Sequence, residues 1–131
     1  MNVQNVVEEL KKQYPGKNII LNPPDEPTEI ICEIESGSLN PDRSVAVAVI
    51  DTTIKHYHRL AVEEYEVIKG ELEVTKEGKT YYLGPGEKIT LNPEEYHLAR
   101  GKETWVKVTS EPAWTPQDQI AVEEGTDFNG R

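Results

Sequence analysis

The sequence predicts an all-β domain, a barrel or sandwich of short strands, with one short α-helix at its N-terminus. From Asn18 onward apolar and polar residues alternate with a period of two, which is typical of strands with one buried face. Turn residues interrupt this alternation at close, regular spacing. Nine prolines, nine glycines and a hydrophobic content of 36% also favour many short strands over a helical bundle.

The first 17 residues carry the pattern of an amphipathic helix. Four apolar residues recur at i, i+3, i+4 and i+7, namely Val3, Val6, Val7 and Leu10. Asn2 can cap the start of this helix, and Pro15-Gly16 ends it. A short apolar stripe needs a covering surface, so we expect the helix to pack on the barrel or across a dimer contact.

The rest of the chain divides into a predicted barrel, residues 18–112, and a tail, residues 113–131. We expect strands at Ile19–Leu21, Glu29–Glu35, Ser44–Thr53, Ile54–His58, Glu64–Lys69, Glu71–Lys76, Lys79–Leu83, Lys88–Leu91, His97–Arg100 and Thr104–Ser110. Turns separate these strands, and Gly101 is interpreted as one of the turns. In the tail, Trp114 and Ile120–Val122 are expected to dock on the barrel, and Gly125–Arg131 to fray.

The bulk properties argue against several classes of partner. The net charge of −10 comes from 24 acids and 14 bases and repels phosphate backbones and anionic lipids, so we expect neither nucleic acid nor a membrane as partner. Cys32 is the only cysteine, which rules out an internal disulfide. Because the sequence has neither the apolar run of a signal peptide nor a stretch long enough to span a membrane, we expect a cytoplasmic protein.

The three histidines of the chain all fit one metal site. His56 and His58 are two residues apart in a predicted strand, so both side chains leave the same face, roughly 6.8 Å apart. After a short turn Glu63 opens the next strand, and a hairpin would bring its carboxylate beside the two imidazoles. His97 can join them only if the barrel closes. The sequence therefore predicts one divalent transition metal bound by His56, His58, Glu63 and His97.

The segment His56–Gly70 resembles the first motif of the cupin superfamily. That motif runs His-x-His, three or four residues, Glu, six residues, Gly, and the spacing here matches it throughout. The second motif of the family resembles Gly86–His97. The departures concern turn residues and leave every metal ligand in place: the opening glycine is Ile50, the Pro-x-Gly is replaced by Asn92-Pro93-Glu94, and the terminal asparagine is Gly101.

The resemblance implies a cupin-type double-stranded β-helix, that is, a jelly-roll barrel, similar to that of mannose-6-phosphate-isomerase-like cupins. In cupins the matching residues bind Fe(II), Mn(II), Ni(II) or Zn(II) and leave positions open for substrate and water. The resemblance also implies a homodimer, the common state in this family.

Strand alternation indicates which side chains face the pocket. Running back from His56 and forward from Glu63, the inward residues are Ile54, Thr52, Ile50, Ala48, Ala46, Tyr65 and Val67, with Ala99 added from His97. Tyr65 is interpreted either as a core residue or as a catalytic phenol. No Lys or Arg clearly points at the metal, which counts against a phosphate-bearing substrate.

These features leave three functions open, all on a small-molecule substrate or ligand. The first is a sugar or sugar-phosphate isomerase or epimerase, with Glu63 or a metal-bound hydroxide as base and Tyr65 as the next catalytic candidate. The second is an Fe(II)-dependent dioxygenase, which an apolar pocket would suit. The third is a binding protein without turnover.

Overall fold

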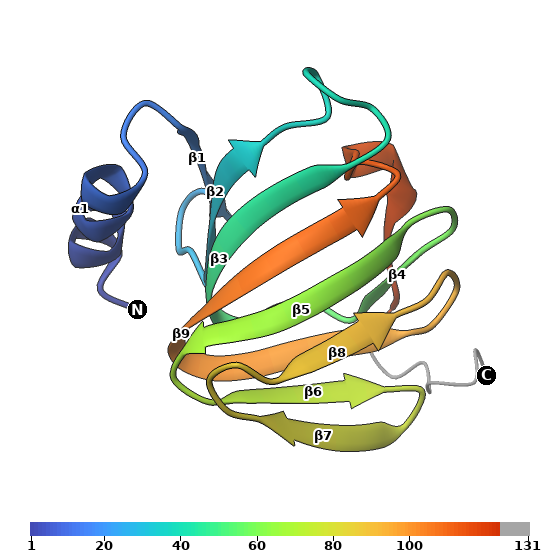
Figure 1. Ribbon diagram of the computed structural model, residues 1–131. Coiled ribbons are helices and arrows are strands. Elements are labelled where there is room, and N and C mark those ends of the chain that lie inside the picture. Colours follow the sequence, from blue (N-terminus) through green and yellow to red (C-terminus); the bar gives the residue numbers. More distant parts are fainter. Residues whose placement is uncertain (124–131) are drawn as a thin grey trace.

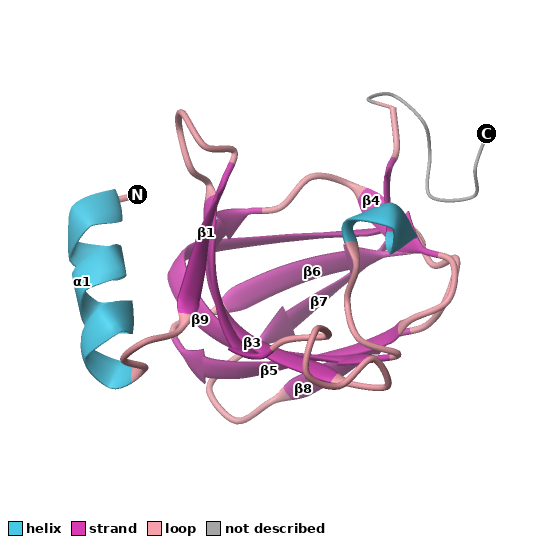
Figure 2. Ribbon diagram, turned by 90° about the horizontal axis from the view of Figure 1, so that it is seen from above, coloured by secondary structure: helices cyan, strands magenta, loops and turns pink. Residues whose placement is uncertain are grey.

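The structure, a computed structural model, describes residues 1–123 of the 131-residue chain. One helix precedes a set of strands (Figure 1), and a short 3-10 helix, the smaller cyan element in Figure 2, lies in the last part of the chain. In chain order the elements are α1 (Val3–Gln13), β1 (Asn18–Asn22), β2 (Glu29–Glu35), β3 (Ser44–Thr52), β4 (His56–His58), β5 (Val62–Lys69), β6 (Leu72–Lys76), β7 (Lys79–Leu83), β8 (Lys88–Leu91), β9 (His97–Glu111), η1 (Pro116–Asp118) and β10 (Gln119–Ala121).

All strand pairs are antiparallel and belong to one strongly curled sheet. The order β1-β2-β3-β9-β4-β10 forms the main path, while β5 pairs with β8 and β9, and β6 pairs with β7 and β9. Seen from above, the strands bend around a common interior and the helix lies outside them (Figure 2). The prediction of an all-β fold with one N-terminal helix is therefore confirmed.

The long strand β9 is the centre of the sheet, because β3, β4, β5 and β6 all pair with it. The predicted turn at Gly101 is wrong, since the strand runs through this position with a register shift in its pairing with β3. A Cβ atom at residue 101 would collide with the side chain of Thr104, so only glycine allows this close approach. Gly101 thus marks an irregularity inside one strand, not the boundary between two.

Two apolar clusters lie on opposite sides of the sheet. The inner cluster fills the barrel and includes Leu72, Val74 and Leu91, which are at most 1% exposed. The outer cluster joins Val6 and Leu10 of α1 to β2, β3 and β9. The helix thus covers the sheet of its own chain and does not need a second copy to bury its apolar face. The homodimer expected from the sequence remains a prediction, which sedimentation analysis would test.

The predicted strand Ile54–His58 is shorter in the structure. The chain leaves the sheet after Thr52 and re-enters it at His56, and Thr53 donates its backbone N–H to the carbonyl of Ala99. This interruption breaks the alternation of side chains between β3 and β4. As a result Ile54, which alternation placed inside, is 57% exposed, although it still lines the cavity described below.

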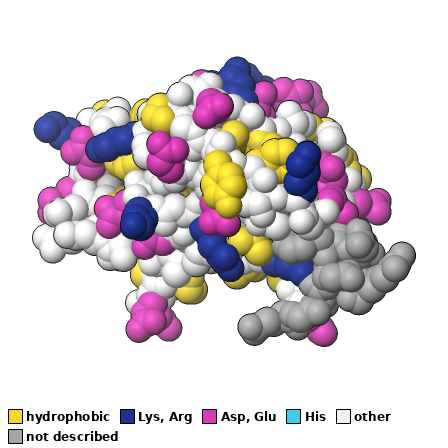
Figure 3. Space-filling model, turned by 90° about the horizontal axis from the view of Figure 1, so that it is seen from below, with side chains coloured by type: hydrophobic (Ala, Val, Ile, Leu, Met, Phe, Trp, Pro, Cys, Tyr) yellow, Lys and Arg dark blue, Asp and Glu magenta, His cyan; other side chains and the backbone are white. Residues whose placement is uncertain are grey.

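The tail docks on the barrel as far as it is described. Strand β10 pairs with β4, and Trp114 donates its indole N–H to the side chain of Gln119. The predicted fraying of Gly125–Arg131 falls outside the described residues. Within residues 1–123 no helix is long and apolar enough to cross a membrane. The face shown in Figure 3 mixes acidic and basic side chains and exposes no histidine.

Candidate metal centre

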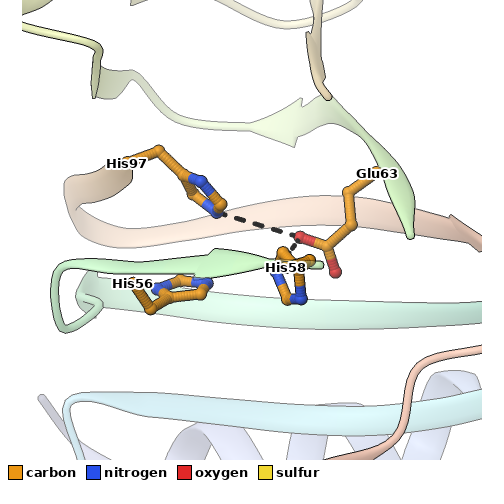
Figure 4. Close-up of side chains that lie close together, drawn as sticks. All are labelled: His56, His58, Glu63 and His97. Carbon is orange, nitrogen blue, oxygen red and sulfur yellow. Dashed lines mark ion pairs between the residues drawn. The ribbon is translucent and has the colours of Figure 1, made fainter. Parts of the chain in front are cut away.

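The three histidines and Glu63 form one compact cluster inside the barrel (Figure 4). Each side chain offers a nitrogen or oxygen atom, and these four atoms all lie within 4.8 Å of one another. All four residues are at most 4% exposed. The structure thus brings together every residue that the sequence predicted as a metal ligand.

The strand pairing explains how residues far apart in sequence meet. His56 and His58 stand on the same face of β4, and His56 is the direct partner of His97 at the start of β9. Glu63 is the second residue of β5, which pairs with the other end of β9. The curl of β9 therefore closes the cluster, as the sequence required for His97 to join.

Backbone carbonyls fix the orientation of two imidazoles. Nδ1 of His56 lies 2.7 Å from the carbonyl oxygen of Ile54, and Nδ1 of His97 lies 2.9 Å from that of Glu95. A carbonyl can only accept, so each Nδ1 carries the proton and each Nε2 keeps a free lone pair. This arrangement is typical of metal-binding histidines, whose second nitrogen donates to an outer partner.

Four buried polar atoms of this cluster make no hydrogen bond of good geometry, and two of them contact each other only as the ion pair between His58 and Glu63. They are Nδ1 and Nε2 of His58, Oε1 of Glu63 and Nε2 of His97. Leaving a buried polar group unpaired costs about 1–3 kcal/mol. A divalent cation would satisfy three of these atoms at once, because carboxylate oxygen and imidazole nitrogen are ligands that transition metals accept. The residues present therefore fit a metal ion.

Electrostatics in the metal-free cluster keep two histidines neutral. Burial is the main cause that lowers the pKa of His97 to about 3, and it also lowers the pKa of His56. At His58 burial works in the same direction, but the ion pair with Glu63 and the interactions with Asp118 together outweigh it and raise the pKa. Nε2 of His58 and Oε1 of Glu63 are 3.0 Å apart. Neutral imidazoles with free lone pairs are the form that binds a metal.

The cluster lies at one side of a narrow cavity of about 70 Å³. His56, Glu63 and Tyr65 line it, together with apolar side chains such as Ile31, Ala48 and Val108. No Lys or Arg of the described chain lines it. A cavity of this volume leaves room for only a small group beside the cluster, and the absence of a cation agrees with the sequence argument against a phosphate group.

The cavity wall also contains Glu29, a residue that sequence reasoning missed. Glu29 opens β2 and pairs with Asn22 across the β1–β2 ladder, and the Asn22 side chain forms a hydrogen bond with it. Burial, and secondarily the charge of Glu63, raises the pKa of Glu29 to about 7. Carboxyl groups with such a pKa in a pocket are candidates for proton transfer. Alternation placed Glu29 on one face of its strand, but only the closed sheet shows that this face looks inward.

The other predicted pocket residues are only partly where alternation put them. Ala46 and Ala48 line the cavity, and Tyr65 faces it while only 4% exposed, its ring 6.3 Å from that of His97. Thr53 lines the cavity in place of Thr52, because the strand ends there. Burial raises the pKa of Tyr65 well above its ordinary value, so this phenol can donate but not serve as a base.

No protein-family model matches the chain, and no characterised protein matches it by sequence. Solved structures do match. Streptomyces Pac13 with uridine has a TM-score of 0.72 at 15% identity, over 84% of this chain and 87% of that one. KdgF from Halomonas gives 0.64 at 20% identity, over 74% and 89%. Oxalate decarboxylase of Bacillus subtilis gives 0.68 at 13% identity, over 83% of this chain but 31% of that one.

These neighbours are proteins of the cupin fold, and at such identities they establish the fold alone. The histidine motif resembles the same family, and its four key residues meet at one point in the barrel. This protein is therefore a small protein of the cupin fold.

Proposed function

We propose that this protein is a metal-dependent enzyme that moves protons on a small, uncharged, hydroxylated molecule, as a sugar isomerase or epimerase does. The observation that carries the proposal is the cluster of unpaired, buried ligand atoms beside a cavity that holds a second carboxyl group, Glu29. A binding protein would also need a cavity, but it would not need a further proton-transfer group such as Glu29.

In this proposal His56, His58, Glu63 and His97 bind one divalent ion, such as Mn(II), Fe(II), Ni(II) or Zn(II). Bound there, the metal would act as a Lewis acid that orients and polarises substrate oxygens. The neighbouring structures support a divalent metal, because one of them describes Mn(II) centres in oxalate decarboxylase.

The chain itself supplies the groups that hold and move protons. Glu29 can take a proton at its carboxylate, since its pKa of about 7 leaves both forms populated at neutral pH. Tyr65 keeps its proton and can donate a hydrogen bond to a substrate oxygen. Glu63 remains the alternative base, but metal ligation would occupy its carboxylate.

The charge of the cavity favours an uncharged substrate over a phosphorylated one. Glu29, Glu33 and Glu35 line it, and none of its described lining residues is a cation. A phosphate group is usually bound by Arg or Lys. The neighbour Pac13, a nucleoside dehydratase solved with uridine, also supports a neutral, hydroxylated ligand. We therefore favour free sugars over sugar phosphates.

Hydrogen exchange tests this function across a panel of possible substrates. Untagged protein loaded with each metal is incubated in D₂O with several aldoses, ketoses and nucleosides. Removal of a C–H proton next to a carbonyl replaces it with deuterium, so the corresponding NMR signal fades. We expect exchange with at least one sugar, dependent on metal, and reduced about 10²–10⁴-fold in Glu29→Gln.

The matched control is Glu64→Gln, because Glu64 neighbours Glu63 but pairs with Lys88 outside the barrel. This variant should exchange at the wild-type rate. Exchange that persists in metal-free protein would contradict the proposal. So would metal-loaded protein that exchanges no proton of any panel member.

The second candidate is an Fe(II)-dependent dioxygenase, which the apolar part of the cavity favours. Ile31, Ala48 and Val108 would tolerate reactive oxygen species better than polar walls. Oxygen uptake by the iron-loaded protein, measured with an electrode on the same panel, separates the two. Uptake without hydrogen exchange would favour the dioxygenase.

A further inference from the structure

A single carboxylate from the tail organises the loop between two of the proposed metal ligands. Asp118, the last residue of η1, accepts hydrogen bonds from the backbone N–H groups of Arg59, Leu60 and Ala61, each at 3.0 Å. Oδ1 accepts the first two and Oδ2 the third. Hydrogen bonds from N–H groups to a charged carboxylate are roughly twice as strong as those between neutral groups.

The three N–H groups belong to the segment that separates His58 from Glu63. Without a partner, this turn could adopt many conformations, and each would change the distance between the imidazole of His58 and the carboxylate of Glu63. With Asp118 in place, the whole turn is bound to one fixed group. Nε2 of His58 and Oε1 of Glu63, on either side of this turn, are 3.0 Å apart.

The tail also pairs with β4, the strand that carries His56 and His58. Strand β10 pairs with β4 so that Gln119 lies opposite His58 and Ala121 opposite His56. Val122 adds a backbone hydrogen bond to the carbonyl of Lys55. The pairing leaves β4, only three residues long, fixed between β9 and β10.

We propose that Asp118 is a positioning residue for the metal centre, and that the segment Thr115–Val122 acts as a clasp that preorganises His58 and Glu63 for the ion. This inference rests on the proposed metal site and goes beyond it by assigning part of the metal affinity to the tail. The carboxylate also places a negative charge near His58, which favours a bound cation. Outer groups that orient metal ligands typically change affinity 10–100-fold when removed.

Metal affinity tests this role directly. Untagged wild type, Asp118→Ala and Asp118→Asn are titrated with Zn(II) against a chelator, and their Co(II) complexes are compared by visible absorption, which reports ligand geometry. We expect the dissociation constant to rise about 10–100-fold in Asp118→Ala, with an altered Co(II) spectrum. Asp118→Asn should fall in between, because its amide oxygen can keep two of the three hydrogen bonds.

A matched control separates positioning from general loss of structure. Glu87 also accepts a backbone N–H, that of Gly84, but its turn lies at the opposite end of β5 from Glu63. Glu87→Ala should keep the wild-type affinity and Co(II) spectrum. If Asp118→Ala does not fold, the comparison of Asp118→Asn with wild type carries the test.

The outcomes distinguish the two proposals. Wild type that binds no metal overturns the proposed function and this inference together. Wild type that binds metal, with both Asp118 variants at the same affinity and with the same spectrum, overturns only the inference.

Discussion

Adjacent residues of β2 face two different environments, a packed apolar layer on one side of the sheet and the candidate site on the other. Ile30 and Cys32 point to the outer side, where α1 covers them, and both are fully buried. Glu29 and Glu33 point to the inner side and line the cavity. One short strand thus contributes apolar surface to a packed layer and carboxyl groups to the candidate site.

The two sides of the sheet differ in whether they bury polar side-chain atoms. The outer cluster is built of aliphatic and aromatic side chains and Cys32, so its burial stabilises the fold through the hydrophobic effect. The inner side holds nitrogen and oxygen atoms of His58, Glu63 and His97 that make no hydrogen bond of good geometry, which lowers the stability of the metal-free protein. Stability sacrificed in this way is typical of functional sites. The apolar clusters of both sides should therefore control unfolding, and the polar groups of the inner side should control metal binding.

The largest effect is expected from His97→Ala on the inner side. The variant loses one of the proposed ligands, so metal affinity should fall by more than the roughly 100-fold upper value for outer groups. The metal-free variant should still fold, because one unpaired buried nitrogen disappears together with the imidazole. Competition titration and circular dichroism check the two parts. A variant that kept wild-type affinity would remove His97 from the site.

Leu10→Ala tests the outer side in the opposite sense. Leu10 is fully buried between α1 and the sheet, so truncation should lower the free energy of unfolding by about 2–5 kcal/mol. The affinity for metal should stay within about twofold below the melting temperature, since no ligand rests on α1. Urea denaturation and metal titration measure both quantities. A large loss of affinity would show that the two sides are coupled.

Glu29→Gln gives a stability effect that depends on pH. In the folded, metal-free protein the pKa of Glu29 is raised from 4.5 to about 7, so between these values the folded state binds more protons than the unfolded state. Wild-type stability should therefore decrease as pH rises through this window, while the amide does not titrate. The stability of Glu29→Gln relative to wild type should grow by up to about 3 kcal/mol from pH 4.5 to pH 7 and then level off.

Thermal unfolding of metal-free protein across this pH range measures the difference. A constant difference between the two proteins would mean that the carboxyl group is solvated like a surface acid. In that case the pKa of Glu29 would not be raised, and the main argument for Glu29 as a proton-transfer group would fail.

Tyr65→Phe should have the smallest effect on structure. The change removes one hydroxyl group and keeps the ring that packs in the inner cluster, so the free energy of unfolding should change by less than about 1 kcal/mol. Metal affinity should be unchanged. If the phenol assists turnover, hydrogen exchange into a substrate should slow while the metal content stays the same. Equal exchange rates would leave Tyr65 as a core residue.

Much of the fold could be predicted because strand alternation is a local property. The strands at Glu29–Glu35, Lys79–Leu83 and Lys88–Leu91 lie where the sequence placed them. The turn expected at Gly101 was wrong because a glycine can mark either a turn or an irregularity within a strand. At Gly101 the second case holds, and it is recognised only from the close approach of the Thr104 side chain in the folded protein. The loss of alternation after Thr52 likewise depends on a hydrogen bond to distant Ala99.

The four clustered residues could be predicted because chemistry and spacing both single them out. His56, His58 and Glu63 are close in sequence, and His97 is the only other histidine. Glu29 and Asp118 could not be found in this way. Each is one of 24 acids. Glu29 gains its role from burial in the closed sheet near Glu63, and Asp118 gains its role from backbone N–H groups of the distant turn after β4.

The most direct test of the account is the metal content and coordination of the wild-type protein. Metal-free, untagged protein is loaded with Zn(II) or Mn(II), and X-ray absorption is measured alongside elemental analysis. We expect one ion per 14.8 kDa chain with imidazole and carboxylate ligands at about 2.0–2.2 Å for zinc, all lost in His97→Ala and His56→Ala. An ion bound without imidazole ligands, or no bound ion at all, would contradict the assignment of the cluster as a metal centre.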